Sequence, residues 1–246
     1  MTFIDRTGEK HITNEGYEIE IIECFGRQNC TIRFECGFVL KYRHYKEIKN
    51  GNIKNPYHKS VHGVGCIGVG PYKKATHIKS YKTWSGMLER CYCEKSLFVR
   101  PTYIGCSVDE RWHDFQNFSK WFEENYIEGY QLDKDILFKG NKIYGPDTCD
   151  FVPHKINSLF VRQSKNRGDL PIGVTYQKNN KNFTVYVNKA NNSRVCYRGI
   201  KTSDEAFLCY KEEKEQYIKE VADEWKDRIS HKIYVAMYNY PVEITD

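Results

Sequence analysis

The first fifty residues alternate between apolar and polar positions. Residues 17–25 and 30–37 are two such runs, the turn FGRQN separates them, and a third run starts at Phe38. Short alternating runs at hairpin spacing are typical of strands that bury one face, so they predict a small antiparallel sheet or barrel over residues 1–50. The alternation fits a sheet and a barrel equally well.

The alternation stops after residue 50. Residues 51–82 are rich in glycine, lysine and histidine and keep no regular apolar period, which predicts a basic linker or extended arm over residues 51–80. The glycines of GVGCIGVG (63–70) could let backbone N–H groups approach a phosphate. A nucleotide loop also needs a strand before it, a helix after it and a Lys-Ser/Thr or acidic ribose ligand in register. The sequence offers none of these, which argues against a nucleotide loop here.

Two later stretches follow the three-four spacing of helices. A helix that starts near Tyr81 would carry four residues on one face: Trp84, Met87, Leu88 and Cys91. Over residues 109–126 the same spacing groups five residues: Trp112, Phe115, Phe118, Ser119 and Phe122. Because the helical period already accounts for the aromatic residues, we expect them to pack in a core rather than to stack on bases.

The last third of the chain predicts three strands and a helix. Residues 174–177, 183–188 and 194–197 alternate, and the polar turns NNKN and KANN separate them. Thr202 and Glu205 form a capping box at the start of the helix. Its apolar face consists of Phe207, Tyr210, Tyr217, Ile218, Val221 and Trp225.

Together these patterns predict an α+β protein. The expected parts are a small β-rich, SH3-like domain (1–50), the basic linker or arm (51–80), a central domain with flanking helices (81–165), a three-stranded sheet with a helix (166–230) and a C-terminal closing strand or tail (231–246).

The net charge of +6 is unevenly distributed along the chain. Residues 38–82 hold ten Lys/Arg against one acid, and residues 166–201 hold seven against one. Between them, residues 83–165 are nearly neutral, and residues 202–228 are acidic. Two basic segments predict surfaces that bind a polyanion, and a merely solvated basic face is the alternative. The 19 tyrosines suit wet interfaces with nucleic acid, or reflect the base composition of the genome.

The sequence predicts a soluble, cytoplasmic protein. No stretch approaches the ~18 apolar residues of a membrane span, and the N-terminus lacks the apolar core of a signal peptide. Most of the ten cysteines are therefore expected to be reduced. A structural Zn²⁺ site is the alternative for four cysteines in the central domain, although their spacing is not that of repeated CxxC pairs: Cys91, Cys93, Cys106 and Cys149.

The central domain contains a series of short motifs. WSGMLERC (84–91) is followed by YIGCSVDERWHDFQNF (103–118), then by LDKDI, IYGPDTC and KIN. In this order they resemble the phage-type HNH endonucleases over about residues 80–165, in which a hairpin and a helix form a ββα-metal fold. The resemblance implies metal-dependent hydrolysis of phosphodiester bonds in double-stranded DNA, with Mg²⁺ or Mn²⁺ as cofactor.

The resemblance also implies roles for particular residues. Asp133 and Asn157 match metal-binding positions, whereas Lys134 stands where the general-base histidine is expected and Thr148 replaces the middle asparagine. Lys134 is expected to grip phosphate, because the neighbouring acids keep its amine charged. His154 and His113 are the candidates for the missing base, or are ordinary surface or core histidines. The alternative for Asp133 and Asp135 is an acidic turn capped by Lys139 or Lys142.

The last third resembles the Apetala/ethylene-response type of DNA-binding domain over about residues 171–225. Its elements are Gly-Val at 173–174, an aromatic-Val strand at 186–187, and GIKT at 199–202 before a helix that contains alanine. In that family the three-stranded sheet lies in the major groove. The resemblance places six residues on DNA: Gln177, Lys178, Lys181, Tyr186, Arg194 and Arg198. Lys73 and Lys74 of the basic arm are expected to contact DNA as well.

Three functions remain open. The first is a homing or defence endonuclease of the kind that bacteriophages encode. The second is a protein whose HNH centre has decayed and that acts as a DNA-binding regulator or as an inhibitor of another nucleic-acid enzyme. The third is a module that binds a protein partner through its tyrosine-rich surface.

Overall fold

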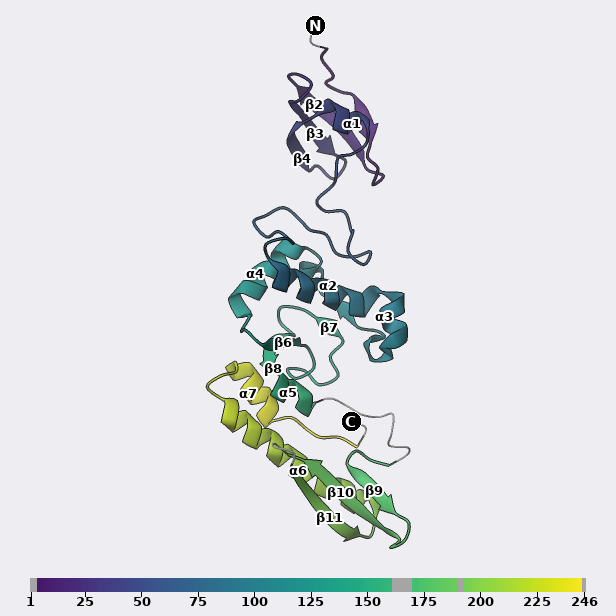
Figure 1. Cartoon of the computed structure of the whole chain (residues 1–246), viewed down its shortest axis with the longest axis vertical. Coiled ribbons are helices and arrows are strands. Elements are labelled where there is room, and N and C mark those ends of the chain that lie inside the picture. Colours follow the sequence, from purple (N-terminus) through teal and green to yellow (C-terminus); the bar gives the residue numbers. More distant parts are fainter. Residues whose placement is uncertain (1–3, 161–169, 190–192, 245–246) are drawn as a thin grey trace. The chain divides into compact units, whose positions relative to one another are not determined.

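The computed structural model describes residues 4–160, 170–189 and 193–244. Helices and several small sheets confirm the predicted α+β class (Figure 1). The chain forms two compact units, and each is described by itself. Unit 1 comprises Met1–Ile104 and Glu110–Lys120, and unit 2 comprises Gly105–Asp109 and Trp121–Asp246.

Unit 1 begins with an antiparallel sheet of four strands. They are β1 (Lys10–Ile12), β2 (Glu18–Cys24), β3 (Cys30–Phe34) and β4 (Val39–Arg43), in the order β1-β2-β3-β4. This order is that of an open meander. Of the two folds that the sequence left open, the structure has the sheet and not the barrel. Helix α1 (Tyr45–Lys49) follows, and its Ile48 packs in the same core as Ile19, Ile21 and Ile32.

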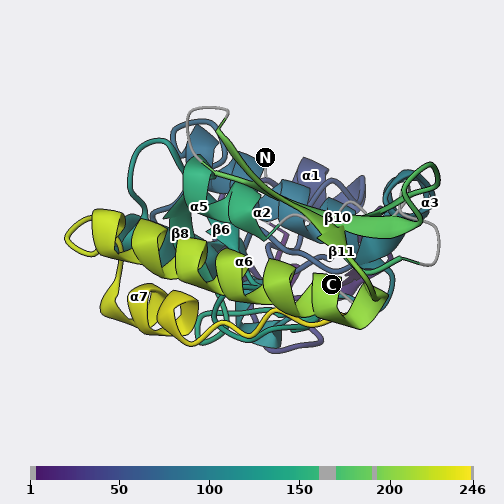
Figure 2. The same ribbon diagram turned by 90° about the horizontal axis from the view of Figure 1, so that it is seen from below.

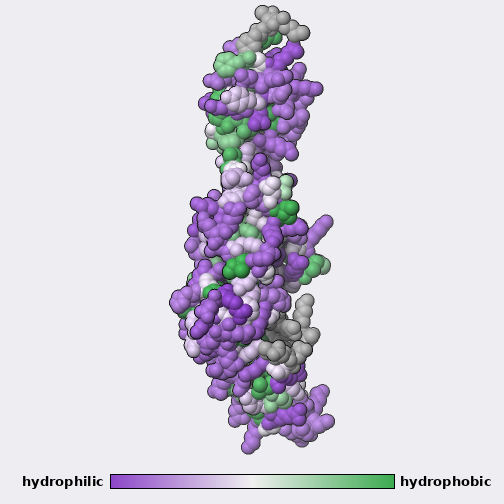
Figure 3. All heavy atoms as spheres, turned by 60° about the vertical axis from the view of Figure 1, so that its left-hand side comes forward, coloured by the Kyte–Doolittle hydropathy of each residue, from purple (hydrophilic) through white to green (hydrophobic). Residues whose placement is uncertain are grey.

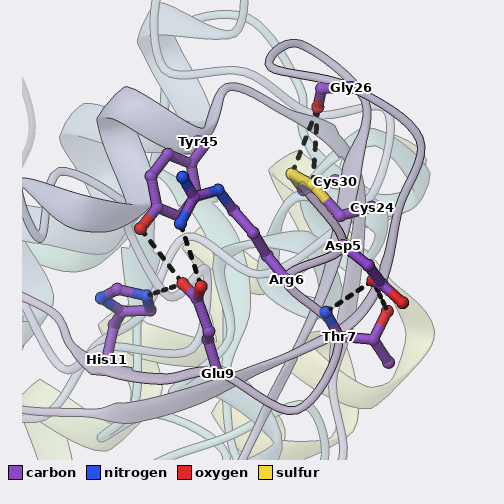
Figure 4. Close-up of a disulfide and its surroundings, with 9 residues drawn as sticks. All are labelled: Asp5, Arg6, Thr7, Glu9, His11, Cys24, Gly26, Cys30 and Tyr45. Atoms are coloured by element: carbon purple, nitrogen blue, oxygen red, sulfur yellow. Dashed lines mark hydrogen bonds and ion pairs between the residues drawn. A yellow bond between two sulfur atoms is a disulfide. The ribbon is translucent and has the colours of Figure 1, made fainter. Parts of the chain in front are cut away.

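Cys24 and Cys30 lie opposite each other on β2 and β3 and form a disulfide (Figure 4). None of the other eight cysteines, all of which lie in the described residues, forms a disulfide. Glu9, in the same view, accepts hydrogen bonds from Arg6, His11 and Tyr45. Burial acts to raise the pKa of Glu9, but the three donors outweigh it and lower that pKa. The carboxylate therefore holds β1 to the residue that opens α1.

The segment predicted as a linker is packed into unit 1. It contains no helix or long strand before Ile78, yet Ile53 and Cys66 are buried. The side-chain amide of Gln116 donates to the carbonyl oxygens of Ile67 and Tyr72, and its oxygen accepts from the Tyr72 N–H. These bonds replace the solvation that a free arm would have, so the linker interpretation is wrong for this stretch.

Both predicted helices of unit 1 are confirmed. Unit 1 contains α2 (Ile78–Tyr92), α3 (Glu94–Val99), the short 3₁₀ turns Pro101–Tyr103 and Glu110–Trp112, and the start of α4 (Phe115–Asn125). Every residue that the helical spacing placed on the two apolar faces is buried. Trp84 donates its indole N–H to the Trp112 carbonyl oxygen at 2.6 Å, which joins the two faces.

Unit 2 contains a hairpin followed by a helix, as the sequence predicts. Strand β6 (Tyr130–Asp133) pairs antiparallel with β8 (Asp150–Pro153), and α5 (His154–Leu159) follows directly. In the intervening loop, β7 (Ile143–Tyr144) pairs in parallel with β5 (Ser107–Val108).

The C-terminal part of unit 2 is a three-stranded sheet backed by a long helix. Strands β9 (Val174–Gln177), β10 (Asn182–Asn188) and β11 (Arg194–Ile200) lie in the order β11-β10-β9. Helix α6 (Ser203–Trp225) begins at the predicted capping box of Thr202 and Glu205. Its apolar residues share one core with Ile136, Val152 and Ile156 of the hairpin and α5. The predicted boundary at residues 165/166 therefore falls within one core.

The predicted C-terminal strand is a helix, α7 (His231–Tyr238). The Ser230 hydroxyl accepts the N–H of Ile233 and caps its first turn. Ile233 and Met237, four residues apart, are buried beside α6. Figures 1 and 2 both show α7 lying along α6.

Within the described residues, no helix is long and apolar enough to cross a membrane. Hydrophilic residues dominate the face shown in Figure 3.

The glycines of GVGCIGVG give a test of this packing. A Cβ at Gly65 would lie 2.5 Å from Leu88 Cδ1 and 2.7 Å from Trp84 Cζ2. We expect Gly65→Ala to lower the free energy of unfolding by about 1–3 kcal/mol through overpacking. Gly86→Ala, whose Cβ would make only an ordinary contact with Arg90 Nη1 at 3.8 Å on α2, should instead raise it by up to about 1 kcal/mol. Urea denaturation measures both, and equal effects would contradict the packing explanation.

Candidate functional site

Asp133 ends β6 and begins a tight turn. Its Oδ1 accepts the backbone N–H groups of Asp135 at 2.9 Å and Ile136 at 2.8 Å. Burial raises the pKa of the Asp133 carboxyl to about 6, although those N–H groups and the nearby Lys134 act in the opposite direction. Within the described residues, the second oxygen of this carboxylate has no hydrogen-bond partner.

Lys134 is buried, with 6% of its surface exposed. Its Nζ donates to Asp135 Oδ1 at 2.5 Å and to the Asn141 carbonyl oxygen at 3.0 Å, and it lies 5.7 Å from the centre of the Tyr144 ring. These contacts close the loop between β6 and β7. They leave Lys134 in a structural role, which corrects the expectation that it grips phosphate.

The sequence left open that Asp133 and Asp135 form an acidic turn capped by Lys139 or Lys142. Lys134 itself closes the turn, and Lys139 donates to the Pro241 carbonyl oxygen and pairs with Glu243. Asn141, which the sequence did not single out, donates to the carbonyl oxygens of Lys134 and Ile143. Thr148 donates to the Ile143 carbonyl oxygen at 2.7 Å and so also serves the loop.

Asn157 lies on α5, facing β6. Its Nδ2 donates to Gln131 Oε1 at 2.9 Å. Gln131 precedes Asp133 by two residues on β6, so both side chains lie on the same face of the strand. The helix that follows the hairpin thus brings Asn157 to the strand of Asp133. Gln131 was not predicted, because its partner is 26 residues away.

The two histidines that the sequence offers as the general base belong to different units. His154 opens α5 and is exposed. His113 belongs to unit 1, where its carbonyl oxygen accepts the Cys66 N–H. The imidazole of His154 has no hydrogen bond with Asp133 in the described part of the chain, so the hairpin does not itself identify a base.

The four cysteines proposed for zinc form no disulfide in the described part of the chain. Cys91, Cys106 and Cys149 are buried and Cys93 is half-buried. Burial raises the pKa of the Cys149 thiol to about 12. Over residues 4–160, 170–189 and 193–244, no three His, Cys, Asp or Glu side chains gather as a metal ion would require.

The C-terminal sheet has two different faces. Residues paired across strands share a face, so the partner pairs Tyr186–Cys196, Asn188–Arg194 and Asn182–Gln177 lie together. Val185 and Val187 alternate with them and pack in the core with α6. The polar set, with Arg198 two residues after Cys196, forms the open face: Gln177, Asn182, Tyr186, Asn188, Arg194, Cys196 and Arg198.

Cations and an aromatic ring meet on this open face. The Arg194 guanidinium lies 5.0 Å from the Tyr186 ring centre, and its Nε donates to Asn188 Oδ1 at 2.9 Å. A hydrogen bond to Cys196 and the charge of Tyr186 raise the pKa of Arg198. Four of the six residues predicted to bind DNA therefore share one surface.

The lysines predicted to bind DNA are not part of the open face itself. Lys178 and Lys181 are exposed in the turn between β9 and β10, at the edge of the open face. Lys73 and Lys74 are exposed in unit 1. Lys189 belongs to the basic segment 166–201. It pairs with Glu213 and Glu220 of α6, so its charge is neutralised on the face of the sheet that packs on the helix.

Helix α6 places its acids away from the open face. Tyr197 donates to Glu213 at 2.5 Å from the side of the sheet that packs on the helix, where Val185 is its cross-strand partner. Figure 2 shows α6 lying along β10 and β11. One side of this domain is therefore basic and aromatic, and the other is acidic.

Comparisons of the chain with family models, with curated proteins and with solved structures found no match.

The raised pKa of Asp133 gives a test of the hairpin geometry. A carboxyl whose pKa is higher in the folded state stabilises the fold below pH ~4, and this stability is lost as the pH rises through about 6. Asp133→Asn keeps the oxygen that accepts both N–H groups and removes the half-buried charge. We expect the variant to be more stable than the parent by roughly 1–3 kcal/mol at pH 8, and equally stable near pH 4.

Urea denaturation across this pH range measures the difference. Asp227→Asn makes the same chemical change at an exposed position and serves as the control. A constant difference from pH 4 to pH 8 would show that Asp133 is not buried as described.

Proposed function

We propose that this protein binds double-stranded DNA through the open face of its C-terminal sheet. The observation that supports this best is the alignment of Gln177, Tyr186, Arg194 and Arg198 on one side of three strands, with α6 covering the other side. Arginine recognises guanine edges and phosphates through its planar set of donors, and a tyrosine ring stacks or packs against sugar. Strands can present such residues to a groove.

The charge distribution supports one orientation. The acids of α6 and the cations of the open face lie on opposite sides of the domain. Phosphates attract the open face and repel the helix, so the duplex would approach the sheet. Lys178 and Lys181 at the strand turn would contact the backbone beside the groove.

Binding is tested with Arg194→Ala and Arg198→Ala. We expect each substitution to weaken the binding of a labelled mixed-sequence duplex by about 1–3 kcal/mol, and to reduce the slope of log K against log salt by about 1 where a phosphate contact is lost. Fluorescence anisotropy at several salt concentrations measures both quantities. Lys226→Ala removes the same charge just after α6 and should leave affinity unchanged. If all three variants bind alike, the sheet is not the interface.

Metal-dependent cleavage is a second candidate. It rests on Asp133 and Asn157, which the hairpin and α5 bring to one strand. Asp133 Oδ2 and Asn157 Oδ1 accept no hydrogen bond within the described residues. Both are oxygen atoms of the kind that Mg²⁺ or Mn²⁺ prefers as ligands. A bound ion would offset charge on the leaving oxygen. Lys134 is engaged in closing the loop. The exposed His154, the first residue of α5, is then the remaining candidate for the general base.

The competing explanation is a centre that no longer cuts, in a protein that regulates DNA or inhibits another nucleic-acid enzyme. Nicking of a supercoiled plasmid with Mg²⁺ or Mn²⁺ separates the two. An active centre should lose at least roughly 10²-fold of its rate in Asp133→Asn, the scale of losing one fixed charged group. Asp227→Asn should cut normally. The absence of cutting with either metal would leave DNA binding as the function.

A further inference from the structure

The N-terminal sheet borders a pocket that the proposed DNA interface does not use. It has a volume of about 320 Å³, at the lower end of the size of small-molecule sites. Its lining comes from β4, α1 and the segment that follows: Leu40, Arg43, Glu47, Asn52, Ile53, Lys54 and Pro56. Three of these residues supply apolar walls and four supply polar groups.

A β-bulge directs Arg43 into this pocket. Cys30 of β3 pairs with Arg43 and Ile32 pairs with Leu40, so two steps along β3 correspond to three steps along β4. Residues three apart on a regular strand face opposite sides, but the extra residue places Leu40 and Arg43 on the same side. That side is the one on which Cys30 and Ile32 are fully buried. Arg43 is half-buried on that side of the sheet.

The bulge requires an unfavourable backbone conformation. Tyr42 has a φ of 58°, in the left-handed region that a bulky residue rarely adopts. Such strained residues concentrate at binding and catalytic sites, where the surrounding structure maintains them.

Arg43 lacks a partner inside the protein at its Nε. This atom is buried and has no hydrogen-bond partner in the described part of the chain. Nε itself has almost no accessible surface, so a ligand in the pocket would meet the two terminal nitrogens of the guanidinium. These two nitrogens also form an edge by which arginine binds the two oxygens of a phosphate or carboxylate, and this edge points to a ligand oxyanion.

The other polar groups narrow the class of ligand. Lys54 adds a second cation, whereas Glu47 adds a carboxylate that accepts hydrogen bonds. Asn52 Oδ1 already accepts from Asn14, which leaves its amide N–H groups as donors. An anion alone would meet Glu47 as a like charge, so the ligand must combine an oxyanion with hydrogen-bond donors and an apolar body. An amino-bearing base joined to a phosphate has these properties.

We propose that this pocket binds a mononucleotide unit with an amino-bearing base, its phosphate on Arg43 and Lys54 and its base between Leu40, Ile53 and Pro56. The choice of a nucleotide rests on the proposed DNA binding. The ligand is either a free nucleotide or the phosphorylated end of a DNA strand, which share this chemistry.

Isothermal titration of the full chain with deoxycytidine monophosphate tests the proposal. We expect binding by the parent protein, at least about tenfold weaker binding by Arg43→Lys, which keeps the charge and loses the two-donor edge, and weaker binding by Lys54→Gln. Lys41→Ala, an exposed cation on the same strand that does not line the pocket, should bind like the parent. Deoxycytidine without phosphate should not bind. Thermal unfolding checks that each variant is folded.

Several outcomes would overturn the proposal: no binding of the nucleotide, equal binding by Arg43→Lys, or binding of free amino acids in its place. Competition between the nucleotide and oligonucleotides with a 5′-phosphate or a 5′-hydroxyl identifies the source of the ligand. Duplex affinity of the Arg194→Ala variant is measured separately, so failure of the pocket and failure of the sheet interface give different results.

Discussion

The packing of α6 against one side of the C-terminal sheet determines what the other side can do. Val185 and Val187 point into the helix, so their strand neighbour Tyr186 must point away from it. The same alternation leads Arg194 and Arg198 to the open face. A shift of one residue in the register of β10 would bury Tyr186 and expose the valines. The hydrophobic core thereby controls the position of every polar group on this surface.

A single buried amine organises the loop of the hairpin. Lys134 joins Asp135 to the Asn141 carbonyl oxygen, and Asn141 in turn fixes the strand that begins at Ile143. Asp133 is then held by backbone N–H groups rather than by a neighbouring cation. A lysine in this position sets the geometry around an acid without presenting its own charge to a ligand.

Periodic features of this chain could be predicted from sequence, and contacts between distant segments could not. The faces of α2, α4 and α6, the three C-terminal strands and the capping box follow from local spacing and are confirmed. Helix α7 was missed because a short apolar run fits either a strand or a helix, and the cap at Ser230 decides between them. The Gln131–Asn157 contact depends on how the hairpin closes. The nuclease and DNA-binding resemblances stay predictions.

The hairpin and the C-terminal helices are joined by more than a common core. Ser230 donates to the buried Asp150 on β8, and Lys155 of α5 pairs with Glu224 of α6. Ile136, Val152 and Ile156 lose their cover if the chain is cut after α5. Neither half can then be exchanged between proteins as a free-standing module. If the C-terminal sheet binds DNA as proposed above, the hairpin is brought to that DNA as part of the same folded unit.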